Sequence, residues 1–213
     1  MPLQKEYEIS DNFEEKIAEY TNESGFDFLL IGAGLSYSEE PFMKEIDTFG
    51  KIKWLNKSIK SVMRQRVRFY PQTLIKDKTK FFIENAKCSV GIFVNRNFHQ
   101  INNTAVVLNT DTDGFLLRYA RRMLQNSTNK DSAITIYDTN NVISRFPDVQ
   151  RDFDRLLQQF PKRARLSANQ TTRPINGSRY DFMLISYQGW NAYPAQTKHT
   201  LKGIPSTLIV NKK

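Results

Sequence analysis

The stretch Asp181-Phe182-Met183-Leu184-Ile185-Ser186 and the closing run Pro205-Ser206-Thr207-Leu208-Ile209-Val210-Asn211 decide how this chain is built. Each contains an apolar run of strand length. Such a run is typical of a strand that is buried on both faces of a parallel sheet. The end of the chain therefore predicts a strand–helix–strand unit.

The same unit occurs earlier in the chain. Phe26-Asp27-Phe28-Leu29-Leu30-Ile31-Gly32 is followed by Cys88-Ser89-Val90-Gly91-Ile92-Phe93-Val94-Asn95. Each copy opens on an aromatic–Asp pair and closes on Val-Asn. The first copy is longer because it carries an insertion, at about residues 38–80. We therefore expect an internal repeat, with a partial copy in residues 1–100 and a complete copy in residues 101–213.

The length allows one α/β domain of two halves or two small domains, and the composition suits a soluble globular chain. The chain has 213 residues and a formal net charge of +9, with Cys88 as its single cysteine and two histidines. It cannot form an internal disulfide, and we expect no metal site. The apolar runs are far shorter than the roughly 20 residues that span a bilayer. No signal peptide is recognised, so a cytoplasmic setting is expected.

Basic side chains gather in three groups, and a basic balance can indicate nucleic acid, an anionic membrane surface or an anionic ligand. The groups are Lys51, Lys53, Lys57, Lys60, Arg64, Arg66 and Arg68; Arg118, Arg121 and Arg122; and Lys162, Arg163 and Arg165. Residues 52–67 predict a basic amphipathic helix, which either docks on the domain or contacts an anionic membrane surface or a partner. Nucleic acid ranks third, because the sequence has no helix-turn-helix or RNA-recognition signature.

The elements alternate in the second half. Strands are expected at 104–109, 133–137 and 163–166, with a helix from Phe115 and another that ends before Pro161. This succession predicts an α/β fold, a parallel doubly wound sheet with helices on both faces. In the first half we expect a short strand near 7–9 and helices at 13–20 and 78–86.

Ligands of doubly wound sheets bind beyond the carboxyl ends of the strands, where the strand order reverses. The candidate ligand residues there are Thr110, Asp111, Thr112, Asp113, Gly114, Ser186, Gln188, Gly189, Gly32 and Gly34. For Asp111 and Asp113 the alternative is a helix N-cap, and for the two N-terminal glycines it is a simple tight turn. His99 lies in a polar segment and is not expected to be catalytic. Because no catalytic or phosphate-loop motif is present, we do not expect an enzyme.

Two stretches resemble a universal stress protein domain. Val106-Val107-Leu108-Asn109-Thr110-Asp111-Thr112-Asp113-Gly114 resembles its opening, and 180–185 with 204–210 resembles its end. The repeat resembles the tandem cytoplasmic C-terminal region of monovalent cation:proton antiporters of the second cation/proton antiporter family. This resemblance implies a soluble fragment of a longer protein, on the cytoplasmic side of the inner membrane. It also implies a transmembrane antiporter core as partner in the same polypeptide, and a homodimer through the closing strands.

The resemblance implies a non-catalytic regulatory, ligand-sensing or assembly domain, with an adenine nucleotide as the candidate ligand near Asp111. Nucleotide-binding family members carry a G-x2-G-x9-G-[ST] phosphate loop, of which only Gly189 remains in residues 186–191. Tyr187 and Trp190 are expected to crowd the place of the phosphates. The alternatives are a free-standing universal-stress-type adenine-nucleotide-binding protein and a basic nucleic-acid-binding module.

Overall fold

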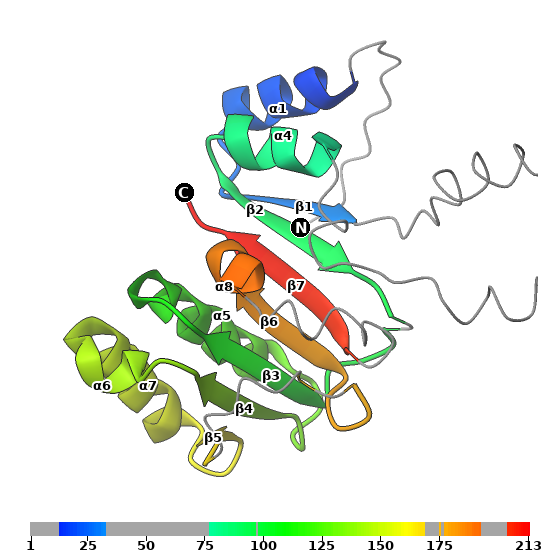
Figure 1. The fold of residues 1–213 in the computed structure, drawn as a ribbon. Coiled ribbons are helices and arrows are strands. Elements are labelled where there is room, and N and C mark those ends of the chain that lie inside the picture. The colour runs from blue at the N-terminus through cyan, green and yellow to red at the C-terminus, as the bar shows by residue number, and fades with distance from the viewer. Residues whose placement is uncertain (1–12, 33–76, 97, 169–174, 176, 193–203) are drawn as a thin grey trace, which may run out of the picture.

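The computed structural model describes residues 13–32, 77–96, 98–168, 175, 177–192 and 204–213, which form an α/β fold around one sheet (Figure 1). The strands are β1 (Phe28–Gly32), β2 (Ser89–Val94), β3 (Asn103–Leu108), β4 (Ala133–Asp138), β5 (Ala164–Leu166), β6 (Phe182–Ser186) and β7 (Ser206–Asn211). The helices are α1 (Phe13–Glu23), α4 (Asp77–Asn85), α5 (Gly114–Asn126), α6 (Val142–Arg145), α7 (Pro147–Gln159) and α8 (Tyr187–Ala192), with a short 3-10 helix at Asp111–Asp113.

The sheet has seven strands in the order β1-β2-β7-β6-β3-β4-β5. The five strands from β7 to β5 are parallel, and β1 is parallel to β2. However, β2 and β7 are antiparallel. The prediction of a parallel sheet with helices on both faces is therefore confirmed for the five strands from β7 to β5. It is wrong at the β2–β7 junction, where the strand direction reverses.

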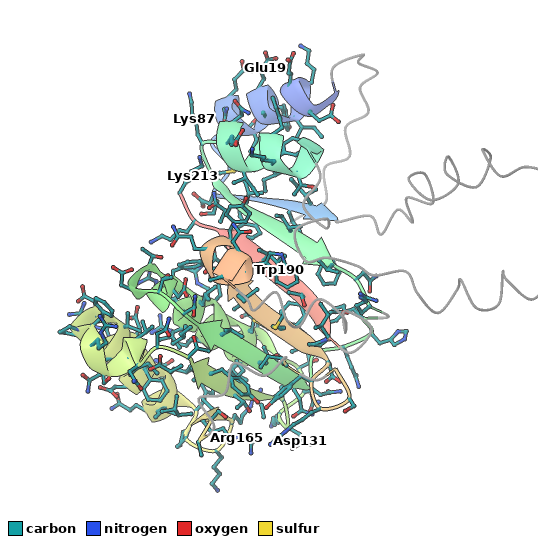
Figure 2. All side chains as sticks on the ribbon, viewed as in Figure 1. Glu19, Lys87, Asp131, Arg165, Trp190 and Lys213 are labelled. Atoms are coloured by element: carbon teal, nitrogen blue, oxygen red, sulfur yellow. The ribbon has the colours of Figure 1, made fainter. Side chains whose placement is uncertain are left out.

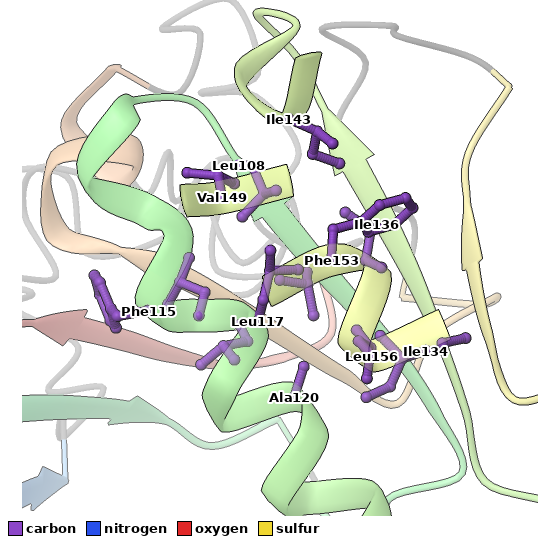
Figure 3. Packing of buried hydrophobic residues seen from close by; sticks show 14 of the residues in the cluster. Leu108, Phe115, Leu117, Ala120, Ile134, Ile136, Ile143, Val149, Phe153 and Leu156 are labelled. Carbon is purple, nitrogen blue, oxygen red and sulfur yellow. The ribbon is translucent and has the colours of Figure 1, made fainter. Parts of the chain in front are cut away.

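One face of the sheet is covered by α5, α6 and α7 (Figure 1). Helix α5 packs on β3 and β6, and α7 packs on α5 and β5. Figure 3 shows Leu117 and Ala120 of α5 with Phe153 and Leu156 of α7 in front of the strands. Burial of these apolar stripes, at about 25 cal/mol per Å², provides the main driving force for docking the helices. Helix α7 ends before Pro161, as the sequence predicts.

The other face carries α1, α4 and α8. Helix α8 packs on β6 and β7, and α4 packs on β2 and α1 (Figure 1). Trp190 of α8, labelled in Figure 2, is 2% exposed in this core. Its neighbours in the cluster include Ile92 of β2 and Ile209 of β7, so this core joins the two halves of the sheet.

Strand β1 differs from its prediction. The apolar run at 26–31 predicts a strand buried on both faces, but β1 lies at the end of the sheet order and Leu30 is 60% exposed. An edge strand has one neighbour, and α1 and α4 cover only one of its faces. Gly25, at φ 65°, ends the segment after α1 in the left-handed conformation that glycine adopts without strain.

The sequence pattern pairs Val94-Asn95 with Val210-Asn211, but these two endings are not at equivalent places in the sheet. Val94 packs in the core under α4 and α8, whereas Val210 packs in the core under α5. Successive strand residues point to opposite faces, so the alignment is one residue out of register.

Several predictions fall outside the described residues: the strand near 7–9, the basic helix at 52–67, and Gly34. The described helices include none that is long and apolar enough to cross a membrane.

Candidate functional site

The strand order reverses between β3 and β6. The chain proceeds from β3 to β4 and β5 on one side, and β6 and β7 lie on the other side. Because β3 and β6 are parallel neighbours, their carboxyl ends lie at the same edge. We call residues 109–114, after β3, and 186–189, after β6, the switch-point loops. This is where doubly wound sheets bind their ligands.

Asp113 holds the first switch-point loop together. Its Oδ2 accepts the backbone N–H groups of Asn109 at 2.7 Å and Thr110 at 2.8 Å, and the residue is fully buried. The Asp113 N–H in turn reaches the carbonyl of Thr110 at 3.0 Å. Asp113 occupies the N-cap position of α5 that the alternative predicted, but its side chain makes no cap hydrogen bond to that helix. Its carboxylate instead forms a capping box with Thr110 at the start of the 3-10 helix that leads into α5.

Gly114 serves close packing between helices. A Cβ added there would lie 3.0 Å from Cγ2 of Val149 in α7. The absence of a side chain at Gly114 therefore lets α5 approach α7 at its first residue.

Four predicted residues gather at the reversal point. The Thr112 hydroxyl donates to Oε1 of Gln188 at 3.1 Å, which joins the two switch-point loops. The Thr110 and Thr112 hydroxyls are 2.9 Å apart. Asp111 is exposed beside them, and its Oδ1 accepts the Thr112 N–H at 3.0 Å. Thr110, Asp111, Thr112 and Gln188 thus form a polar surface that a ligand could reach.

The second switch-point loop is very short, since α8 begins directly after β6. The Ser186 Oγ accepts the Gly189 N–H at 2.9 Å. A Cβ at Gly189 would lie 3.0 Å from that oxygen and 3.2 Å from Cγ1 of Ile185, so glycine permits this tight strand-to-helix junction. Gly189 therefore takes part in packing rather than in a glycine-rich loop.

The expectation that Trp190 and Tyr187 crowd a phosphate site stays a prediction. Trp190 is buried beneath α8, and Tyr187 is half-buried against the same core. The direct passage from β6 into α8 is what leaves no room for a phosphate loop.

A polar network at the end of β4 was not anticipated from the sequence. The Thr139 hydroxyl donates to Oδ1 of Asn109 at 2.8 Å, and the Asn140 amide donates to the Asn109 carbonyl at 2.8 Å. Asp138 accepts the N–H groups of Val142 and Ile143 at 2.6 and 3.0 Å. The run Asp138-Thr139-Asn140-Asn141 directly after an apolar strand is the signal that could have indicated it.

Gly32 lies apart from the switch-point loops. It ends β1, and β1 runs antiparallel to β6 because β2 and β7 are antiparallel. The carboxyl end of β1 is therefore at the opposite edge of the sheet. The structure does not bring Gly32 together with Asp111 or Gln188.

Some of the basic side chains in the described residues are held within the fold. Arg118 forms an ion pair with Asp152 at 2.9 Å. Arg163 donates to the carbonyl groups of Ser132, Leu124 and Asn129. The first basic group, at 51–68, lies outside the described residues.

Cys88 is buried, as its position at the head of an apolar run predicts. His99 is exposed between β2 and β3. Within the described residues, no three His, Cys, Asp or Glu side chains gather in a group that could hold a metal ion.

Comparison of the sequence with models of protein families gives no match. A search of curated proteins gives no match either.

Proposed function

We propose that this chain is a non-catalytic regulatory domain of a monovalent cation:proton antiporter, on the cytoplasmic side of the membrane. In this role it senses a small ligand or mediates assembly, and so biases the transporter between states. The observation that carries the proposal is the arrangement of the sheet. A complete five-stranded parallel half, with a reversal point, is joined edge to edge to a two-stranded half.

The register of the sheet supports a tandem repeat with internal two-fold symmetry. Phe28 lies opposite Ser89, as Phe182 lies opposite Ser206. With this correspondence Ile92 matches Ile209, and these two buried residues lie opposite each other in the antiparallel pair. A two-fold axis through that pair exchanges β1–β2 with β6–β7. The first copy then supplies only the two closing strands, which resembles the tandem arrangement of the antiporter region.

The switch-point loops are the ligand site of this proposal. The complete half has both β3 and β6, whose loops are joined by the Thr112–Gln188 hydrogen bond. The two-stranded half has β1 in the place of β6 and no described counterpart of β3. One ligand site per chain is therefore expected, with Asp111 as its exposed carboxylate.

A panel of ligands tests this site. Thermal unfolding is measured with ATP, AMP, cyclic mononucleotides, cyclic dinucleotides and adenosine. A ligand that binds only the folded chain adds about 2.7 kcal/mol at about 100 times its Kd. We expect one member to raise Tm, and Asp111→Ala to abolish the shift. Asp131→Ala is the matched control, because Asp131 is an exposed carboxylate before β4, at the other edge of the sheet (Figure 2).

A second experiment separates the antiporter domain from a free-standing nucleotide-binding protein. The coding sequence upstream of the chain is read for apolar helices in frame. If they are present, ion transport is compared between the intact protein and its Asp111→Ala variant, with Asp131→Ala alongside. A transport rate that responds to the ligand only when Asp111 is present supports regulation. An upstream reading frame that encodes no apolar helices favours the free-standing nucleotide-binding protein. The geometry of the switch-point loops supports that alternative as well.

Nucleic-acid binding is the remaining alternative. It predicts an affinity for DNA or RNA that falls steeply with salt. The internal contacts of Arg118 and Arg163 favour the ligand-sensing function instead. Binding measured at low salt distinguishes the two, since absence of binding there rules out the nucleic-acid function.

A further inference from the structure

The two outer strands of the sheet, β1 and β5, differ in how they are protected (Figure 1). An outer strand presents unpaired N–H and C=O groups to other chains, and proteins guard such edges with short strands and charged side chains. Strand β5 has both forms of protection, because it has three residues with Arg165 at its centre. Strand β1 has five residues and neither a charged residue nor a proline. Strand β1 is therefore the unprotected edge of the described sheet.

Exposed apolar side chains gather at the same edge. Among the described residues, the large apolar side chains that remain exposed are Tyr20, Phe26, Leu30 and Leu166. The first three belong to α1, to β1 or to the segment between them, and Leu30 is the most exposed, at 60%. The ring centroids of Tyr20 and Phe26 lie 5.8 Å apart. An apolar surface beside unpaired strand backbone is typical of an interface formed by strand addition.

The backbone of β1 directs alternate residues to this edge. The Asp27 carbonyl accepts the Ser89 N–H, so the polar backbone groups of Asp27 face β2. Because these groups alternate in direction along a strand, those of Phe28, Leu30 and Gly32 face away from β2. No strand within the described ranges pairs with β1 on that side. Leu30 is at the centre of the three outward-facing residues.

A second copy of β1 fits this edge in the antiparallel sense. A two-fold axis at Leu30 places Leu30 opposite Leu30 of the second copy, and Phe28 opposite Gly32 of the second copy. A Cβ added at Gly32 would meet no described atom within 4 Å, so there is open space where the Phe28 ring of the second copy would lie. Residues 28–32 carry no charge, so like charges do not meet across the axis. The strand therefore complements itself, as a two-fold interface requires.

The chain already contains a junction of this kind. Strands β2 and β7 are antiparallel, with Ile92 opposite Ile209. Helix α4 packs on β2 and α8 packs on β7, and both contribute to the core on the same face of the sheet. A two-fold axis perpendicular to the sheet preserves its faces in this way. Strand β7 itself is paired on both sides, with β2 and β6, and has no free edge for a second chain.

We propose that β1 pairs with β1 of a second copy of this chain, so that the sheet continues through a homodimer. This inference goes beyond the proposed function, because it requires neither a ligand nor a transporter core. The pairing provides partners for the outward-facing N–H and C=O groups and covers Leu30. Because the contact is two-fold, it closes at two copies. A five-residue junction is small for a protein interface, so we expect a Kd of about 10 µM.

Sedimentation equilibrium of the full 213-residue chain tests the inference. Between about 1 and 100 µM, the average mass should rise toward twice the 24.9 kDa of one chain. Leu30→Lys should keep the mass of one chain throughout, because two lysines would meet at the axis. Leu166→Lys is the matched control, since it places the same charge at the β5 edge and should leave the rise unchanged. Circular dichroism of each variant checks that it is folded.

A covalent test does not depend on how well the lysine variant folds. Residues that face each other as a hydrogen-bonded antiparallel pair have Cα atoms about 5.5 Å apart, a separation that a disulfide can bridge. Under mild oxidation, Leu30→Cys should therefore form a disulfide-linked dimer about ten times faster than Leu166→Cys, because association raises the local thiol concentration. Cys88 is buried and should not contribute.

Four results would overturn the inference. A mass of one chain at every concentration would mean that something other than a second copy covers β1. A dimer that persists in Leu30→Lys, or that dissociates in Leu166→Lys, would place the interface elsewhere. Equal oxidation rates of the two cysteine variants would show that β1 is not at the axis. Assemblies larger than two copies would contradict a closed contact. None of these results affects the ligand site, which the panel of nucleotides tests separately.

Discussion

Strands β1 and β6 are near twins in sequence and opposites in environment. Phe28-Leu29-Leu30-Ile31-Gly32 and Phe182-Met183-Leu184-Ile185-Ser186 share the positions of Phe, Leu and Ile. All five residues of β6 are buried, whereas β1 is partly exposed along its length. Strand β6 lies between β7 and β3 under helices on both faces, whereas β1 lies at the end of the sheet.

This difference teaches that an apolar run specifies a strand but not its place in a sheet. Phe and Ile favour the extended conformation in both strands. The free energy that each side chain contributes depends on how much of it the fold removes from water. The two halves should therefore respond differently to the same substitution.

The largest expected difference is at the matched leucines. Leu184→Ala should lower the free energy of unfolding by about 3 kcal/mol, because Leu184 is fully buried and truncation leaves a cavity. Leu30→Ala should cost less than about 1 kcal/mol, because Leu30 is 60% exposed. Urea denaturation of the two variants measures the difference. Equal losses would show that Leu30 is covered in solution and would remove the contrast between the halves.

The aromatic–Asp pairs that precede β1 and β6 give a smaller contrast. Oδ2 of Asp181 accepts the N–H groups of Asn102 and Asn103 at 3.1 and 2.9 Å, and so ties the start of β6 to that of β3. Asp27 is exposed, and its backbone carbonyl accepts the Ser89 N–H. Asp181→Ala should cost about 1 kcal/mol and Asp27→Ala no more than about 0.5 kcal/mol.

Denaturant midpoints at pH 7 measure this second contrast. A cost at Asp27 equal to that at Asp181 would indicate that the first copy uses its carboxylate in the same way. That result would support the proposed two-fold symmetry between β1–β2 and β6–β7. It would contradict the predicted difference in stability between the Asp181 and Asp27 variants.

The smallest expected effect is a pH dependence confined to the complete half. The Tyr137 and Tyr180 hydroxyls are 2.8 Å apart, and burial together with this hydrogen bond raises the pKa of Tyr137 to about 12 from its ordinary 10.0. Between these pH values the unfolded chain has lost a proton that the folded chain keeps. Stability from Tyr137 is therefore present below pH 10 and is lost as pH rises toward 12.

Tyr137→Phe removes this contribution. Its free energy of unfolding should fall less steeply than that of the wild type between pH 10 and 12, when both are followed by denaturant titration. Tyr180→Phe is the matched variant, because it breaks the same hydrogen bond but leaves Tyr137 half-buried, so an intermediate slope is expected. Identical slopes in all three proteins would mean that the Tyr137 pKa is not raised.

Much of the candidate site could be predicted from the sequence, because turn residues directly after apolar runs identify the carboxyl ends of strands. Thr110, Asp111, Thr112 and Gln188 were found in this way, and the structure brings them together at one edge. The Asn109–Asn140 contact could not be predicted, because it depends on β3 and β4 being adjacent.

The roles of individual residues also depended on contacts. Asp113 and Asp111 are both aspartates in one turn, yet Asp113 is fully buried and binds two backbone N–H groups, whereas Asp111 is exposed. Gly114 and Gly189 were candidates for ligand approach, but the side chains of Val149 and Ser186 lie beside them. A glycine in sequence does not reveal what occupies the space of its missing side chain.

The sequence by itself determined the elements that alternate in the second half, the apolar strands at 28–32, 89–94, 182–186 and 206–211, and the turn at 110–114. These features follow from apolar periodicity and turn chemistry, which act between residues close in the chain. Only the tertiary structure decided that β2 pairs with β7 in the antiparallel sense and that β1 is an edge strand. It also decided that Gly32 and Asp111 lie at opposite edges of the sheet. Strand neighbours and their direction depend on hydrogen bonds between distant segments, and local sequence carries little information about these pairings.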